Sequence, residues 1–179
     1  MIKLVVGTET MFFLCLIMAF VYFSFAPGFK HQQLNSLDIR STGIFSVLLF
    51  SSSFTYWRAE TNFKKGKIGQ LKIWLLLTLV LGFIFLFGQG REYLSLLNNH
   101  VSISSSSFGT SFFTLTGFHG LHVFAGLIII VVITLLTFLG DYDHHTKSSV
   151  FSTVGIYWHF VDIVWLFVFI IVYIIPRLS

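Results

Sequence analysis

Five ionisable side chains stand inside stretches of sequence that are otherwise apolar. His159 and Asp162 are three residues apart, His119 and His122 have the same spacing, and Glu9 lies in an earlier stretch. A charge near the centre of a bilayer costs at least ~2.5–3.5 kcal/mol, so an ionisable residue there indicates a partner or a function. These five groups are the candidates for any chemistry in this chain.

The histidine spacing allows two kinds of chemistry. His119 and His122 share one face of a helix, because residues three apart lie on the same side. With His159 as a third candidate they could supply axial nitrogens to haem, or they could be structural residues that hydrogen-bond across helices. Asp162 can fix the tautomer or the charge of His159, or the two can form a polar clamp between helices. Spacing alone leaves these alternatives open.

Glu9 also has two interpretations. Its carboxylate could extend to the membrane interface or stay neutral, since loss of solvation disfavours the charged form. Alternatively, it exchanges protons or pairs with a histidine. No nucleophile–base pair, glycine-rich phosphate loop or thiolate cluster occurs, and the one cysteine, Cys15, lies in an apolar stretch. We therefore expect no catalytic centre of the chain's own and no thiolate metal site.

The composition indicates an integral membrane protein. Of the 179 residues, 55% are hydrophobic and 10% are charged, whereas soluble domains average about 25% charged residues. The mean hydropathy is +0.87 and the pI is about 9.3. The basic residues flank the apolar stretches, so no nucleic-acid partner is predicted.

Five apolar stretches approach the ~20 residues that a spanning helix needs. The first exceeds the apolar core of a signal peptide, so we expect it to be retained. The segments between stretches are too short for a soluble domain, which predicts one all-α membrane domain over residues 1–179. The predicted transmembrane helices are residues 4–25, 41–60, 71–90, 110–138 and 150–175.

The distribution of basic residues predicts the orientation of this five-helix bundle. Inner loops carry an excess of Lys and Arg, which places the N-terminus inside and the C-terminus outside. The inner loop before the last helix holds four titratable groups, Asp141, Asp143, His144 and His145. They form either a solvated turn or a proton-collecting patch. The predicted inner basic residues are Lys3, Arg58, Lys64, Lys65, Lys67, Lys72 and Lys147, and the outer ones are Lys30, Arg40, Arg91 and Arg177.

Three motifs resemble subunit III of the haem–copper terminal oxidases, the cytochrome c oxidase and quinol oxidase subunit III family. The resemblance covers essentially the whole chain. The common long form has seven helices, whereas this chain resembles its last five, as in short bacterial forms. The motifs are Thr-Gly-Phe-His-Gly-Leu-His at 116–122, Tyr-Trp-His-Phe-Val-Asp-Ile-Val-Trp at 157–165 and Thr-Glu-Thr-Met-Phe-Phe at 8–13, with further matches at Gln89, Glu92 and Tyr93.

The resemblance implies an accessory subunit without cofactor in a respiratory oxidase that reduces oxygen to water and pumps protons. Haem and copper are then expected in subunits I and II, with subunit I in direct contact. The family also implies support of proton uptake, protection of the catalytic subunit, and structural phospholipid in a cleft that the missing helix pair partly forms. The implied location is a bacterial inner membrane. The electron donor, cytochrome c or quinol, stays open.

Two alternatives accompany this interpretation. One is a related partner of a nitric oxide reductase, and the other is a haem-binding membrane anchor that uses His119, His122 and His159. In the subunit III interpretation, Glu9 matches a carboxylate that reacts with carbodiimide in the family and is expected to be protonated or paired with a histidine. We predict that Glu9, the three histidines and Asp162 form one buried polar network among the first, fourth and fifth helices.

Overall fold

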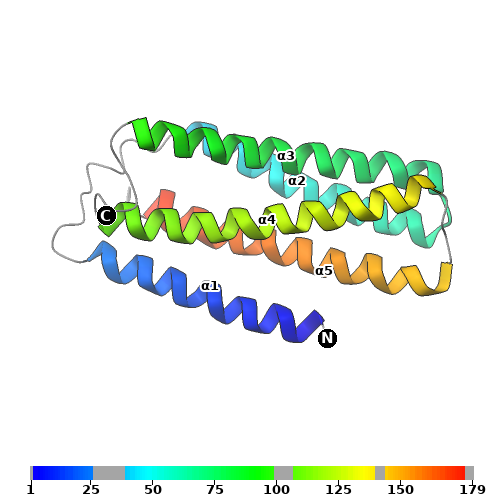
Figure 1. The fold of residues 1–179 in the computed structure, drawn as a ribbon, viewed down its shortest axis with the longest axis horizontal. Coiled ribbons are helices and arrows are strands. Elements are labelled where there is room, and N and C mark those ends of the chain that lie inside the picture. The colour runs from blue at the N-terminus through cyan, green and yellow to red at the C-terminus, as the bar shows by residue number, and fades with distance from the viewer. Residues whose placement is uncertain (1, 26–38, 99–106, 140–143, 176–179) are drawn as a thin grey trace.

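The chain folds as an up-and-down bundle of α-helices (Figure 1). The computed structural model describes residues 2–25, 39–98, 107–139 and 144–175, with 144–148 as backbone alone. Within these ranges every regular element is helical, which confirms the predicted all-α class and its five helices. The elements are α1 (Ile2–Ser24), α2 (Ile39–Lys64), α3 (Ile68–Asn98), α4 (Ser107–Leu139) and α5 (His144–Phe169), continued by the π-helical turn η2 (Ile170–Ile174).

Several helices extend beyond their predicted ends. α3 continues to Asn98 although its apolar stretch ends near residue 90, and α5 begins at His144 rather than at residue 150. An apolar stretch marks the part of a helix that suits lipid, whereas backbone hydrogen bonding continues through polar residues. His144 and His145 therefore lie in the first helical turn of α5 and not in a loop, while Asp141 and Asp143 lie outside the described residues.

α2 differs from the other helices in its polarity. α1, α3, α4 and the segment Ser149–Ile174 are long and apolar enough to cross a membrane. α2 has 26 residues but a run of serines and threonines, of which Ser46, Ser52 and Thr55 are buried. Small polar side chains permit close helix approach and hydrogen bonding in membranes. The interior of the bundle, not lipid, therefore receives the polar face of α2.

A tight turn fixes α2 beside α3. Gly66 has a φ of 68°, a left-handed conformation that glycine adopts without the Cβ penalty. The N–H groups of Gly66 and Lys67 donate to the carbonyls of Phe63 and Asn62, at 3.0 Å each. With so short a connection the two helices lie antiparallel and adjacent, as Figure 1 shows.

Aromatic side chains fill the centre of the bundle. Trp158 and Trp165 of α5 and Tyr56 of α2 are among the largest fully buried residues. Gly126 of α4 makes room for one of them, because a Cβ at this position would lie 2.9 Å from the ring of Trp158. Both tryptophans therefore pack inside the bundle rather than at its lipid-facing surface.

Candidate functional site

A hydroxyl group joins the predicted His159–Asp162 pair. Ser53 of α2 donates from Oγ to Oδ2 of Asp162, and the same Oγ lies 2.8 Å from Nδ1 of His159. Asp162 is 4% exposed, whereas His159 is partly exposed. The second carboxyl oxygen of Asp162, Oδ1, has no hydrogen-bond partner among the described residues. We call these three residues the serine-bridged triad.

Further hydrogen bonds join α2 to α5 on both sides of the triad. Trp158 Nε1 donates to Ser52 Oγ at 3.1 Å, and Trp165 Nε1 donates to Ser46 Oγ at 2.8 Å. Tyr56 Oη donates to the carbonyl of Phe151 at 3.0 Å. Indole and phenol groups need such partners when they are buried. The α2–α5 seam is thus hydrogen-bonded over most of its length.

Carboxylates stand at both ends of this seam. At one end the Glu60 carboxylate accepts a hydrogen bond from Ser152 at 2.6 Å and forms an ion pair with Lys64 at 2.8 Å. At the other end Glu92 of α3 accepts from Thr42 Oγ1 at 3.1 Å and from Tyr173 Oη at 2.7 Å. Glu60 therefore links α2 to α5, and Glu92 links α3 to both α2 and η2.

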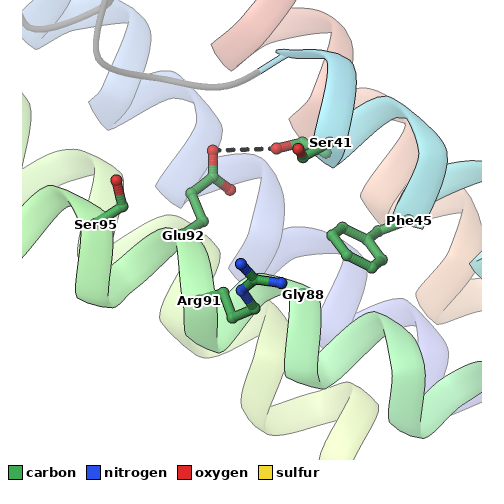
Figure 2. A pocket seen from close by; sticks show the side chains of 7 residues that line it. Ser41, Phe45, Gly88, Arg91, Glu92 and Ser95 are labelled. Carbon is green, nitrogen blue, oxygen red and sulfur yellow. Dashed lines mark hydrogen bonds between the residues drawn. The ribbon is translucent and has the colours of Figure 1, made fainter.

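The Glu92 end contains a small pocket between α2 and α3. The pocket has a volume of about 220 Å³, and Figure 2 shows the Glu92 carboxylate directed toward Ser41. The site mixes one acid, one base and several hydroxyl groups with one aromatic ring, which suits a small polar or zwitterionic group. Its lining residues are Ser41, Thr42, Phe45, Gly88, Arg91, Glu92 and Ser95.

Glu9 of α1 pairs with His122 of α4. Glu9 Oε2 lies 3.0 Å from His122 Nε2, and His122 Nδ1 lies 2.7 Å from the carbonyl oxygen of Phe118. A carbonyl oxygen only accepts, so Nδ1 carries a proton and donates it. One proton is then shared between Nε2 and the carboxyl group, as an ion pair or as a neutral acid–imidazole contact. The expected pairing of Glu9 with a histidine of the fourth or fifth helix is present.

His119 has a different environment from His122. Its side chain is fully buried, and neither ring nitrogen has a hydrogen-bond partner among the described residues. The ring stacks on Trp165 with centroids 4.7 Å apart, and Phe85 meets it edge-on at 6.2 Å. His119 therefore acts here as an aromatic packing residue.

The structure divides the five predicted residues into three groups rather than one network. Glu9 with His122 joins α1 to α4. His159 and Asp162 join α5 to α2 through Ser53, and His119 packs against aromatic rings. The sequence did not identify Ser53 as the partner of His159 and Asp162, because a single serine in a membrane stretch does not indicate which residue it binds. The run Ser51-Ser52-Ser53 inside a membrane stretch was the available clue, since small polar residues gather at helix interfaces.

A large apolar groove lies between α1 and α5. Its volume is about 530 Å³, and Thr10 is the one polar residue among those that line it. Such an apolar surface suits acyl chains rather than water. The groove is lined by Thr10, Phe13, Leu14, Ile17 and Met18 of α1 and by Phe160, Ile163, Val164, Phe167 and Ile171 of α5 and η2.

The described residues contain no group of three or more His, Cys, Asp or Glu side chains placed to hold a metal ion. The fold and its polar contacts thus define an integral membrane bundle in which Glu9 pairs with His122 and Glu60 with Lys64. The sequence profile of the family described as cytochrome c oxidase subunit III matches residues 1–176. The chain belongs to this family.

Individual relatives agree with the family assignment. A probable cytochrome c oxidase subunit 3 of Nocardia farcinica is 37% identical over 93% of this chain and 82% of that protein. The corresponding protein of Mycobacterium leprae is 33% identical over 94% of this chain and 83% of its own length. A cytochrome c oxidase subunit 3 of Synechocystis is 34% identical over 93% of this chain and 71% of its own length. The resemblance inferred from the motifs is confirmed.

Proposed function

We propose that this chain is the accessory subunit III of a haem–copper oxidase that reduces oxygen to water and pumps protons across a bacterial inner membrane. The carrying observation is the family match over residues 1–176. Haem and copper then reside in subunits I and II, and this chain contacts subunit I. Its own role is to support proton uptake and to protect the catalytic subunit.

The partner experiment uses an affinity tag on this chain. After mild solubilisation, the co-purifying catalytic subunit is identified by mass spectrometry, and oxygen and nitric oxide reduction are both assayed. A haem–copper oxidase that consumes oxygen supports the proposal. Recovery of a nitric oxide reductase instead supports the alternative partner, and an untagged strain is the control for carry-over.

A haem-binding anchor has weaker support from the geometry. The rings of His119, His122 and His159 are directed at Trp165, Glu9 and Ser53 respectively. Axial ligation needs ring nitrogens that point at one iron. The absorbance spectrum of the isolated chain tests this alternative, since bound b-type haem gives a strong Soret band, whereas the accessory role predicts none.

Phospholipid is the second proposed partner, with acyl chains in the α1–α5 groove. Ile163 lines this groove and is 55% exposed. A Trp at this position fills part of the groove, so Ile163→Trp is expected to reduce the phospholipid that co-purifies, measured by native mass spectrometry. Ile156→Trp is the matched control, because Ile156 lies on the same helix, is 43% exposed and does not line the groove. Equal lipid loss in both variants contradicts the proposal.

The inner end of the bundle is the proposed site at which this chain supports proton uptake by the oxidase. His144 and His145 in the first turn of α5, with Asp141 and Asp143 before it, form a candidate proton-collecting patch on the predicted inner surface. Replacing both histidines by Asn is expected to slow proton uptake by the whole complex, most strongly at high pH, where protons are scarce. Unchanged pumping at high pH contradicts this role.

The orientation of the chain is a separate proposal, with the N-terminus inside and the C-terminus outside. A reporter fused to the C-terminus tests it.

A further inference from the structure

The serine-bridged triad has a feature that helix packing does not require. A single hydroxyl oxygen contacts both an acid, Asp162, and a base, His159. Either group alone could hold α2 against α5, as the neighbouring serines hold Trp158 and Trp165. An acid and a base on the same hydroxyl instead form a continuous path for a proton.

The valence of serine limits the triad to two arrangements. The hydroxyl of Ser53 has one proton to donate and lone pairs with which to accept. If it donates to a carboxylate at Asp162, then His159 must donate to it from a protonated Nδ1. If instead a protonated Asp162 donates to Ser53, the hydroxyl donates onward to an unprotonated Nδ1. Both arrangements keep the same heavy-atom positions.

We propose that Asp162, Ser53 and His159 form a proton relay inside the membrane. The O–H bond of the Asp162 carboxyl breaks as its proton bonds to Ser53 Oγ, and the original Ser53 proton moves to Nδ1 of His159. One proton is thereby transferred from the carboxyl group to the imidazole. Ser53 ends as it began, with one hydroxyl proton, and no electron changes hands.

Burial gives the relay a closed and an open end. Asp162 is 4% exposed, while His159 and Ser53 are partly exposed. Both ends lie near the middle of the membrane segment Ser149–Ile174. His159 uses Nδ1 for Ser53, so its Nε2 is the atom through which protons enter or leave.

Two titratable groups of α2, Tyr56 and Glu60, lie on the side of His159 that faces one end of the bundle. The ring of Tyr56 meets the imidazole edge-on at 6.4 Å, and Glu60, one turn further along α2, interacts with it electrostatically. Glu60 in turn contacts Lys64 at the end of α2. The relay therefore has titratable neighbours on one side and a buried acid on the other.

Hydrogen–deuterium exchange followed by infrared spectroscopy of the intact complex tests the relay. The difference between the natural protein and an Asp162→Asn variant isolates the carbonyl band of protonated Asp162. Ser53→Ala is expected to slow deuterium exchange of this band by about 100-fold, the lower part of the range for a positioned proton-transfer group. Ser53→Thr, which keeps a hydroxyl, restores the rate. Ser52→Ala is the matched control, because it removes an adjacent serine that binds Trp158 and leaves the triad intact.

A hydrogen bond that serves packing alone predicts the opposite result. Removing Ser53 would then loosen the seam and speed exchange, or leave it unchanged, and either outcome overturns the relay. His159→Leu provides a second test if the Ser53 variant assembles poorly, since it removes the open end and is expected to slow exchange similarly. Absence of any protonated carboxyl band for Asp162, at every pH where the complex is intact, also overturns the proposal.

Discussion

The α2–α5 seam and the packing of α1 represent two ways of joining helices in lipid. Along the seam, serines of α2 meet indole, imidazole and carboxyl groups of α5, and Trp158 and Trp165 are fully buried. By contrast, 11% of the apolar window of α1 is buried. Its described side chains make one hydrogen bond to another helix, between Glu9 and His122, beside ring contacts of Phe12 and Phe13 with α4.

This difference indicates where stability and where adaptability reside. Lipid tails are as apolar as leucine, so association of helices depends on close packing and on hydrogen bonds rather than on the hydrophobic effect. The seam has both, and we expect it to form the rigid part of the bundle. α1 has one polar contact and a groove, so lipid or a neighbouring subunit can contribute to its position.

The largest expected effect is a cavity in the seam. Trp158→Ala removes a fully buried ring and is expected to cost about 3–5 kcal/mol of unfolding free energy, as for large-to-small core changes. Detergent-titrated unfolding followed by tryptophan fluorescence and circular dichroism measures it. Trp57→Ala is the control on α2, because Trp57 is 50% exposed. Equal losses in the two variants would show that the seam is no more rigid than the lipid-facing surface.

Overpacking against Trp158 is expected to have the next largest effect on the unfolding free energy. Gly126→Ala puts a Cβ 2.9 Å from the Trp158 ring, and we expect a cost of about 1–3 kcal/mol. Gly43→Ala adds a Cβ with nothing within 4 Å, so its greater helix propensity should be neutral or stabilising. A bundle equally stable in both variants would mean that the seam relaxes more easily than its contacts indicate.

Loss of a single hydrogen bond of the seam is expected to cost less unfolding free energy than either change at Trp158. Ser46→Ala leaves Trp165 Nε1 without its acceptor, and interhelical hydrogen bonds in membranes average about 0.6 kcal/mol, with a maximum near ~1.7. Ser51→Ala is the matched control, because Ser51 is exposed and its hydroxyl donates to the carbonyl of Val47 in its own helix. Tryptophan fluorescence should report a change at Trp165 in the first variant alone.

The sequence predicted the seam less well than it predicted the helices. Apolar stretches of about 20 residues locate membrane helices because the thickness of the bilayer sets their length. They do not reveal which helix faces which, and the acceptors for Trp158 and Trp165 lie more than a hundred residues away in the chain. His119 and His122 illustrate the same limit. They are three residues apart and were expected to share one face of the helix. Their different angles around α4 nevertheless give His122 a carboxyl partner and His119 an aromatic stack.

The smallest expected effect, and the one that defines α1 most sharply, concerns the Glu9–His122 contact. Both side chains are partly exposed, at 30% and 17%, so a double-mutant cycle with Glu9→Gln and His122→Phe should give a coupling free energy of roughly 0.2–1 kcal/mol. Carbodiimide labelling adds a second measurement. A carbodiimide needs a protonated acid, and loss of the imidazole removes the base that shares its proton, so His122→Phe should increase labelling of Glu9. Decreased labelling with a coupling above that range would place the proton on the carboxyl group of the intact pair and make α1 as firmly held as the seam.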